Sequence, residues 1–186
     1  MSLIWIWATS VGIVALIVIM FVYYYNKFVT KGLRIDNSLA QIDVQLKKRA
    51  DLVPNLIETV KGYAKHEKGI MEDVTKARKA LLSAKDIPSK VRAGDQLQNA
   101  LKSIFAIAEN YPQLRANENF LQLQNELSAI EDKVAYARQY YNDTILDFNN
   151  SVKVFPGKFF ASLYSVKERP FLEIAERERA VPKVSF

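Results

Sequence analysis

The sequence contains no cysteine and one histidine, His66, among its 186 residues. The missing thiols exclude disulfides, thiolate zinc sites, iron–sulfur clusters and cysteine nucleophiles. The pattern His66-Glu67-x-x begins like the zinc-protease motif H-E-x-x-H, but Ile70 stands at the second ligand position. Six glycines and six prolines are few turn formers for this length, which predicts long elements. We therefore expect few turns, no metal site and no cofactor.

Patterns typical of enzymes are also scarce. Gly62 and Gly69 stand alone, so no glycine-rich phosphate loop is formed, and no G-x-S-x-G elbow occurs. Adjacent acids such as Glu72 and Asp73 point to different sides of a helix, which favours a solvated face over a catalytic pair. An enzymatic alternative, with Tyr141 or carboxylates as acid–base groups, has no nucleophile–base pair to support it. We expect that the protein is not an enzyme.

The first charged residue is Lys27, and the segment before it is apolar. Leu3 to Tyr25 spans about 23 residues, long enough as a helix to cross a hydrocarbon core of roughly 30 Å. A cleaved signal peptide is the alternative, but nothing before Lys27 is basic and the run ends in FVYYYNK. The pattern predicts a retained anchor over residues 1–26. Aromatic rings suited to the two headgroup interfaces flank it: Trp5 and Trp7 at one end, and Tyr23, Tyr24 and Tyr25 at the other.

Basic residues follow the anchor at Lys27, Lys31 and Arg34, and none precedes it. The positive-inside rule places residues 27–186 in the cytoplasm, with a short N-terminus outside. Residues 27–90 carry 14 Lys or Arg against 8 Asp or Glu, an excess that suits anionic membrane lipids as partners. We do not expect nucleic acid as a partner, because no aromatic-basic RNA signature or helix-turn-helix spacing is present.

The rest of the sequence has helical periodicity. Apolar residues from Leu39 to Leu81 recur every three or four positions, and Pro54 lies inside this stripe. Because the stripe keeps its phase, we expect a kink near residues 51–54 and no reversal, with Asp51 capping the helix that restarts. Residues 84–89 have loop character. Ser89 is a candidate cap for a helix over residues 90–109, which ends at residues 110–112.

The strongest periodicity lies between Phe120 and Phe155, where apolar residues step alternately by three and four. A one-sided helix of this length needs partner helices. The predicted fold is all-α, with an N-terminal transmembrane helix continuing into an antiparallel, up-and-down bundle of three to four long helices. The expected divisions are the anchor at 1–26, the helical bundle at 27–153 and an aromatic-rich C-terminal segment at 154–186.

Two groups of residues interrupt the apolar pattern. The first is polar or helix-breaking: Arg49, Asp51, Pro54 and Asn55 in one stripe, and Tyr141, Asn142 and Asn149 in the other. These residues either satisfy one another within the fold or form a docking surface for another subunit or protein. The second group is aromatic and follows the last long helix: Phe155, Phe159, Phe160 and Tyr164. It either covers the bundle or contacts the membrane or a second subunit.

Three long segments, QIDVQLKKRADLVPNLIETVKGYAKHEKGIMEDVTKAR (41–78), AENYPQLRANENFLQLQNELSAIEDKVAYARQYYNDTILDFNNSV (108–152) and FPGKFFA (155–161), resemble the LemA family of bacterial proteins. The similarity runs through nearly the whole chain, including the closing PKVSF. It implies a single-pass protein of the bacterial inner membrane with a cytoplasmic helical bundle and no established enzymatic activity. Some relatives are linked to membrane organisation, including bacterial organelle formation. A sensor kinase shares the family's name, but this sequence lacks kinase motifs.

Two functions are compatible with these features. The first is a membrane-anchored structural or scaffold protein that forms homo-oligomers through its helices. The alternative is an adaptor that presents its bundle to another, unidentified membrane protein.

Overall fold

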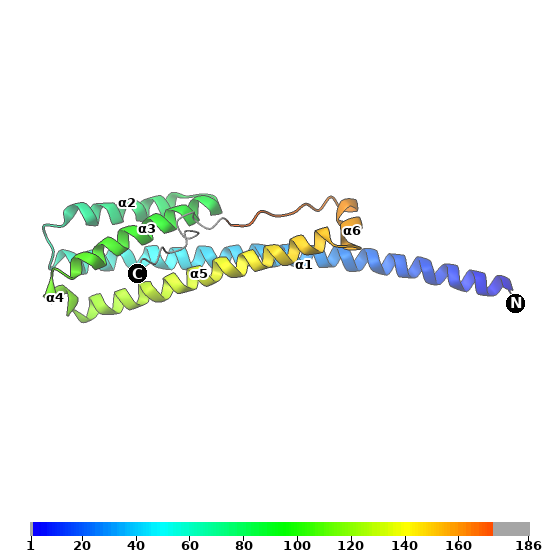
Figure 1. Cartoon of the computed structure of the whole chain (residues 1–186), viewed down its shortest axis with the longest axis horizontal. Coiled ribbons are helices and arrows are strands. Elements are labelled where there is room, and N and C mark those ends of the chain that lie inside the picture. The colour runs from blue at the N-terminus through cyan, green and yellow to red at the C-terminus, as the bar shows by residue number, and fades with distance from the viewer. Residues whose placement is uncertain (1, 173–186) are drawn as a thin grey trace, which may run out of the picture. The chain divides into compact units, whose positions relative to one another are not determined.

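The computed structural model describes residues 2–172, and these residues form helices and the segments that connect them (Figure 1). The all-α prediction is therefore confirmed for this part of the chain. The predictions on residues 173–186, including the closing PKVSF, lie outside the described residues. The helices are α1 (Ser2–Lys61), α2 (Lys68–Ser83), α3 (Ile87–Ala108), α4 (Pro112–Arg115), α5 (Glu118–Lys153) and α6 (Gly157–Leu163).

The chain divides into two compact units. Unit 1 comprises Met1–Ser38 and Tyr140–Phe186, and unit 2 comprises Leu39–Gln139. The division falls inside α1 and inside α5, so each of these helices contributes residues to both units.

The start of α1 is apolar and fully accessible. Within residues 2–172, α1 is the one helix that is long and apolar enough to cross a membrane. The large hydrophobic side chains from Leu3 to Ile19 lie on the surface, where lipid would cover them. The helix continues from this stretch to Lys61.

Helix α1 continues through Pro54, so the chain does not reverse there, as predicted, and no new helix starts at Asp51. Pro54 lies inside α1, and Asp51 is an exposed residue in the middle of the helix, so it caps nothing. The chain turns only after Lys61, where both Tyr63 and Ala64 donate their backbone N–H to the Val60 carbonyl. The single stripe predicted from Leu39 to Leu81 therefore belongs to two helices, α1 and α2. The spacing of three and four residues continues across the turn because both helices turn an apolar side toward the same core.

The start of α3 also differs from the prediction. Asp86 is the cap, and its carboxylate accepts a hydrogen bond from the backbone N–H of Ser89 at 2.9 Å. Ser89 lies within the first turn and donates its hydroxyl to the same carboxylate at 2.8 Å. These bonds, that from the Ser89 backbone first, lower the pKa of Asp86. The longer acidic side chain takes the role that the sequence pattern gives to the serine.

The core of unit 2 lies where α1, α3 and α5 approach one another. Leu46, Leu56, Leu97, Leu101 and Ile104 are fully buried there. Gly94 of α3 allows the close approach, because a Cβ added to it would lie 2.7 Å from Cδ2 of Leu46.

Helix α5 has 36 residues and buries the predicted seam on one side. Phe155 departs from this pattern because α5 ends at Lys153, and its ring is 82% exposed. The buried seam residues in unit 2 are Phe120, Leu127, Ile130, Val134 and Ala137, and those in unit 1 are Tyr141, Ile145, Phe148 and Val152.

Candidate functional site

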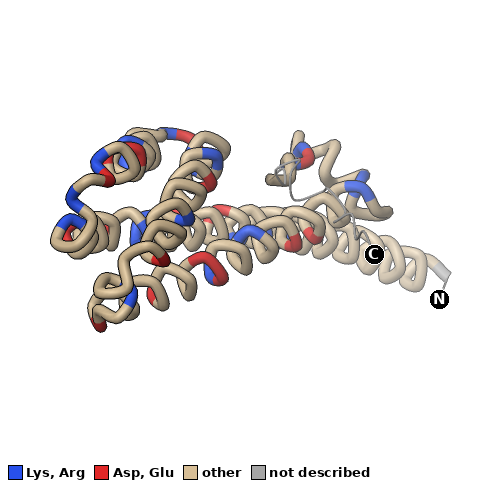
Figure 2. Tube along the Cα trace, turned by 60° about the vertical axis from the view of Figure 1, so that its left-hand side comes forward, with Lys and Arg blue, Asp and Glu red and all other residues tan. Residues whose placement is uncertain are grey.

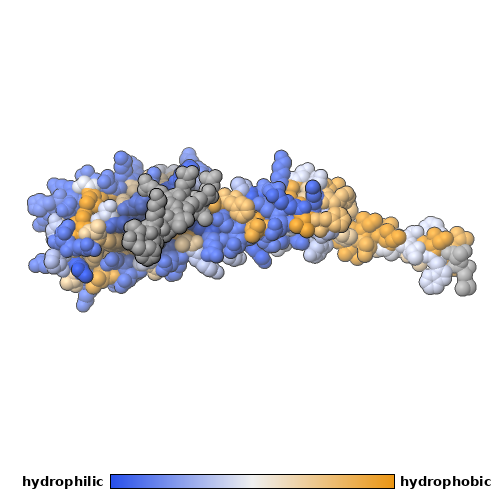
Figure 3. Space-filling view, viewed as in Figure 1, coloured by the Kyte–Doolittle hydropathy of each residue, from blue (hydrophilic) through white to orange (hydrophobic). Residues whose placement is uncertain are grey.

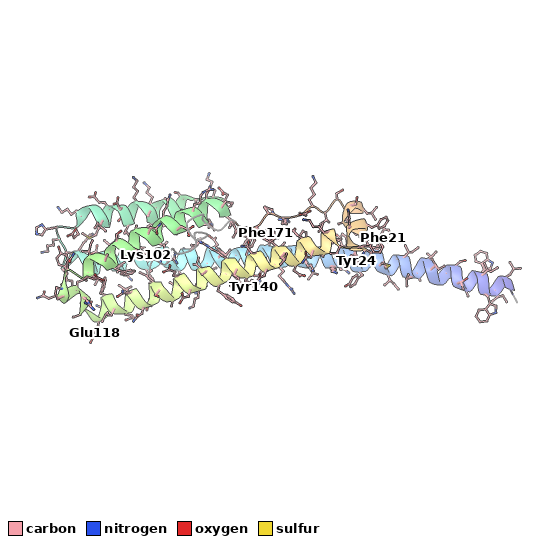
Figure 4. The ribbon with its side chains drawn as sticks, in the orientation of Figure 1. Phe21, Tyr24, Lys102, Glu118, Tyr140 and Phe171 are labelled. Carbon is pink, nitrogen blue, oxygen red and sulfur yellow. The ribbon has the colours of Figure 1, made fainter. Side chains whose placement is uncertain are left out.

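In unit 1, the short helix α6 packs against the end of the apolar stretch of α1. The Phe160 ring stacks on Tyr24 at 4.6 Å between centroids, with the planes 6° apart. The same ring meets Phe21 edge-on at 5.2 Å. The Tyr164 hydroxyl donates a hydrogen bond to the Phe21 carbonyl at 2.9 Å. Figure 4 shows Phe21 and Tyr24 beside α6. We call these residues, with Phe28, the aromatic junction.

Gly157 makes this packing sterically feasible. A Cβ at this position would collide with the carbonyl oxygen of Ser151 and would touch the Tyr24 ring. Glycine at the start of α6 thus lets the helix fold back closely onto the end of α5 and onto α1.

The four C-terminal aromatic residues predicted as one group have different environments. Phe160 is buried and Tyr164 is half-buried in the aromatic junction, whereas Phe155 and Phe159 lie exposed. One side of α6 therefore packs internally, as a cover would, whereas the side that carries Phe155 and Phe159 is exposed.

The residues predicted to mark the membrane interface all belong to α1. Lys27 lies over the rings of Tyr23 and Tyr24, at 5.7 and 5.4 Å from their centroids. Lys31 forms an ion pair with Asp147 of α5 at 2.7 Å. The remaining members are exposed: Trp5, Trp7, Tyr25 and Arg34.

Two asparagines of α5 bind the chain's own C-terminal segment, residues 165–172. The Asn149 amide accepts from the Arg169 N–H and donates to the Arg169 carbonyl, both at 2.9 Å. The Asn142 amide does the same with Leu172, at 2.9 and 3.3 Å. We call this pair the asparagine clamp. Both partners of the clamp belong to the same chain, and neither is a residue of the predicted kink at 51–54.

The spacing of the clamp follows from elementary geometry. Asn142 and Asn149 are seven residues apart, which is about 10 Å along a helix. Arg169 and Leu172 are three residues apart, which is about 10 Å in extended chain. The segment runs antiparallel to α5, so each amide side chain pairs with a backbone as a neighbouring strand would. Burial raises the pKa of the nearby Tyr141 hydroxyl. The positive charge of Arg169 acts in the opposite direction and lowers this pKa.

In unit 2, Pro54 has a partner that the sequence pattern does not show. A proline has no N–H, so the carbonyl of Ala50 four residues earlier lacks its helical donor. Nε of Arg78, on α2, donates to this carbonyl at 2.8 Å. The missing bond within α1 is thus replaced by a bond that joins α1 to α2.

Arg49 is a charged residue of the unit 2 core, only 2% exposed. Its Nη1 donates to the Gly94 carbonyl at 3.5 Å. Burial lowers the pKa of Arg49, whereas Glu131 raises it. Close by, Arg138 and Asp95 form an ion pair at 2.6 Å. Arg49 therefore belongs to a core network of charges that joins α1, α3 and α5.

Unit 2 contains an open groove of about 910 Å³ at the α1–α2 turn. Its floor includes the apolar side chains of Ile57 and Met71, both buried. We call it the basic groove because five lysines line it with one glutamate, Glu72; Figure 2 shows Lys and Arg positions on α2. The lysines are Lys61, Lys65, Lys68, Lys76 and Lys79.

A second, smaller groove of about 300 Å³ contains the last of the predicted docking residues, Asn55. Asn55 is exposed on α1 and faces Asn119 and Glu126 of α5 across this groove. In the part of the chain that the structure describes, no three His, Asp or Glu side chains come together as a metal site.

Comparisons with known proteins agree with these features. A family model described as the LemA family matches residues 38–186. The chain belongs to the LemA family. The resemblance inferred from its motifs is thereby confirmed, and the family match together with the apolar start of α1 supports a membrane protein of the LemA type.

Relatives of this LemA family member include proteins from three bacteria. Protein LemA of Metamycoplasma hominis is 24% identical, over 83% of this chain and 71% of its own length. Magnetosome protein MamQ of Magnetospirillum gryphiswaldense is 22% identical, over 77% of this chain and 62% of its own. Magnetosome protein MamQ 2 of Paramagnetospirillum magneticum is 21% identical, over 80% and 64%. The chain thus spans about two thirds of the length of these relatives, and none of their names describes an enzyme.

Proposed function

We propose that the protein is a membrane-anchored scaffold that self-associates, with the basic groove of one copy receiving the acidic face of α5 from another. The observation that supports this proposal is the groove itself, which combines five lysines with an apolar floor. Exposed acidic residues along the unit 2 part of α5 supply a complementary surface: Glu118, Glu126 and Asp132.

The two surfaces belong to different sides of unit 2. Figure 1 shows α1 between α2 and the first part of α5, so a copy does not close its own groove with its own acidic face. Pairing between copies would then be head-to-tail, and repetition of such a contact produces a ring or a row. Either assembly would gather many anchors in one patch of membrane.

The relatives support a role in membrane organisation. Two of those compared are named as magnetosome proteins, after a bacterial organelle. We extend this role to the present chain as a scaffold at the bacterial inner membrane. The anchor spans the membrane, and the chain after Lys27 lies in the cytoplasm.

Charge exchange tests self-association directly. We expect light scattering of the full-length protein in detergent to give a mass well above that of a monomer at micromolar concentration. Lys68→Glu with Lys76→Glu should reduce it to a monomer, and so should Glu118→Lys with Glu126→Lys. A mixture of the two variants should associate again, because each then offers the charge that the other lacks.

Lys85→Glu is the matched control, because Lys85 is exposed outside the groove. It should leave the mass unchanged. A wild-type protein that stays monomeric, or a mixture that fails to associate, would contradict the scaffold proposal.

The open, apolar floor of the groove also favours the second candidate, an adaptor that binds an acidic segment of another membrane protein. A photoactivatable crosslinker at Thr75, which lines the groove, distinguishes the two in cells. A scaffold gives crosslinked dimers of this chain, whereas an adaptor gives one dominant product that contains a different protein.

A further inference from the structure

The outer side of α6 and the turn before it form a continuous apolar surface. We call it the α6 apolar face and define it by the side chains of Val154, Phe155, Phe159 and Leu163, which are 61, 82, 61 and 52% exposed. Soluble surfaces rarely display so many large apolar side chains together, so such a patch indicates a contact with lipid or protein.

The position of α6 along the anchor identifies the contact. Phe160 and Tyr164 hold α6 against Phe21 and Tyr24, in the last turns of the apolar stretch of α1. Phe21 precedes Lys27, the first charged residue, by six residues, or about 9 Å of helix. This is the depth at which aromatic side chains gather at a membrane interface.

The neighbouring surface and charges agree with this depth. Figure 3 shows apolar surface on α6 and on the adjoining anchor part of α1, where Val18, Val22 and Tyr25 are exposed. Lys158, between Phe155 and Phe159 in sequence, is exposed and supplies a positive charge beside the α6 apolar face. A short element with apolar side chains toward lipid and a lysine toward the headgroups is typical of interfacial segments.

We propose that the α6 apolar face inserts into the headgroup region of the same leaflet that the anchor leaves at Lys27. The membrane then holds the chain at two sites, the anchor and α6, which are more than a hundred residues apart in sequence. This inference goes beyond the scaffold function and does not depend on the basic groove.

Depth-dependent quenching tests the proposal in the full-length chain. Because the protein has no cysteine, Phe155→Cys and Phe159→Cys each accept one fluorescent label. The labelled proteins are reconstituted in vesicles of phosphatidylcholine and phosphatidylglycerol that carry a lipid-attached quencher, either shallow or deep in the acyl chain. Shallow quencher should lower both emissions by about two-fold or more, and deep quencher less, because interfacial segments bury their apolar side only at the headgroup boundary.

Leu33→Cys is the matched control, because Leu33 belongs to the same unit and is 64% exposed. It follows Tyr25 by eight residues, about 12 Å farther along α1, and should be quenched little. Quenching at Phe159 equal to that at Leu33 would overturn the proposal. Strong self-quenching between labelled copies without lipid quenching would overturn it too, because a second copy would then cover α6.

Discussion

At the scale of single residues, the carbonyl of Ala50 explains how α1 accommodates a proline in its interior. Such a proline costs about 3 kcal/mol, in part because it leaves a carbonyl without a donor. Pro54 lies on the exposed side of α1, where its ring does not disturb the core, and Arg78 supplies the missing donor from α2. The carbonyl that Pro54 leaves without a donor in α1 thereby becomes the acceptor of a hydrogen bond from α2.

This exchange of donors predicts an interaction between two substitutions. Arg78→Met should lower the free energy of unfolding by about 1–3 kcal/mol, because it leaves the Ala50 carbonyl without a partner. In a Pro54→Ala background the new alanine has a backbone N–H that can serve this carbonyl, so the same substitution should cost clearly less. Thermal unfolding in detergent, followed by circular dichroism, measures both costs.

Arg92→Met is the control for the loss of a positive charge, because Arg92 is exposed and bonds only to the Ser89 hydroxyl among the residues described. Its cost should be small and equal in both backgrounds. An Arg78→Met cost that is unchanged by Pro54→Ala would show that the bond does not replace the missing one.

Sequence reasoning can identify the unusual residues but not their partners. Pro54, Asn142 and Asn149 stand out because they interrupt an apolar stripe. Arg78 has the pattern of a surface charge, and it becomes a helix-joining donor only when α2 folds back on α1. Such pairings depend on the path of the chain between distant residues, which local periodicity does not contain.

At the scale of elements, α5 serves two different neighbours with one helix. The apolar side chains along one side of α5 are buried in the cores of both units. In unit 1 the asparagine clamp also binds the segment 165–172. The segment has no strand partner in the described residues, so the clamp provides the hydrogen bonds that a sheet would give.

Removal of one clamp residue should free the segment. Asn149→Leu keeps the size of the side chain but leaves the N–H and the carbonyl of Arg169 without partners. We expect the Arg169 amide to exchange with solvent about ten-fold faster, since loss of two part-buried hydrogen bonds costs about 1–3 kcal/mol. Hydrogen exchange read by mass spectrometry on peptides that contain residues 165–172 measures this change.

The adjacent Asn150 offers a matched control, because it is exposed on the same turn of α5. Asn150→Leu should leave the exchange of this segment as it is in the wild type. Equal exchange in both variants would mean that the clamp does not hold the segment in solution.

The sequence predicts regular elements better than their ends. The alternating spacing of three and four residues between apolar side chains identifies the buried side of α5 correctly from Phe120 to Val152. The pattern misses the turn after Lys61, because Gly62 and Gly69 resemble isolated helical glycines and the stripe keeps its phase across them. It leaves the α6 fold-back open for a similar reason, since that depends on a close approach at Gly157 that hydrophobic patterning does not record.

At the scale of the whole molecule, charge is the feature that decides the orientation of the chain in a membrane. Residues 1–26 contain no Lys or Arg, whereas Lys27, Lys31 and Arg34 follow them. Lys31 is paired with Asp147 and Lys27 lies over two tyrosine rings, and all three residues lie within nine positions of Tyr25 along α1. The scaffold proposal places the chain after Lys27 on the cytoplasmic side, and the α6 proposal then places α6 at the cytoplasmic leaflet.

Cysteine labelling in cells tests this orientation. With a membrane-impermeant maleimide, Ser2→Cys should be labelled in bacteria whose outer surface is accessible, whereas Leu33→Cys should be labelled only after permeabilisation. The reason is that a Lys or Arg excess beside a span holds that end in the cytoplasm. Lys27→Gln with Arg34→Gln, which leaves the Lys31–Asp147 pair intact, should produce a mixture of orientations and partial labelling of Leu33→Cys in intact cells. Full labelling of Leu33→Cys before permeabilisation in the otherwise unchanged chain would reverse the orientation, because the groove and α6 would then face the outside of the membrane.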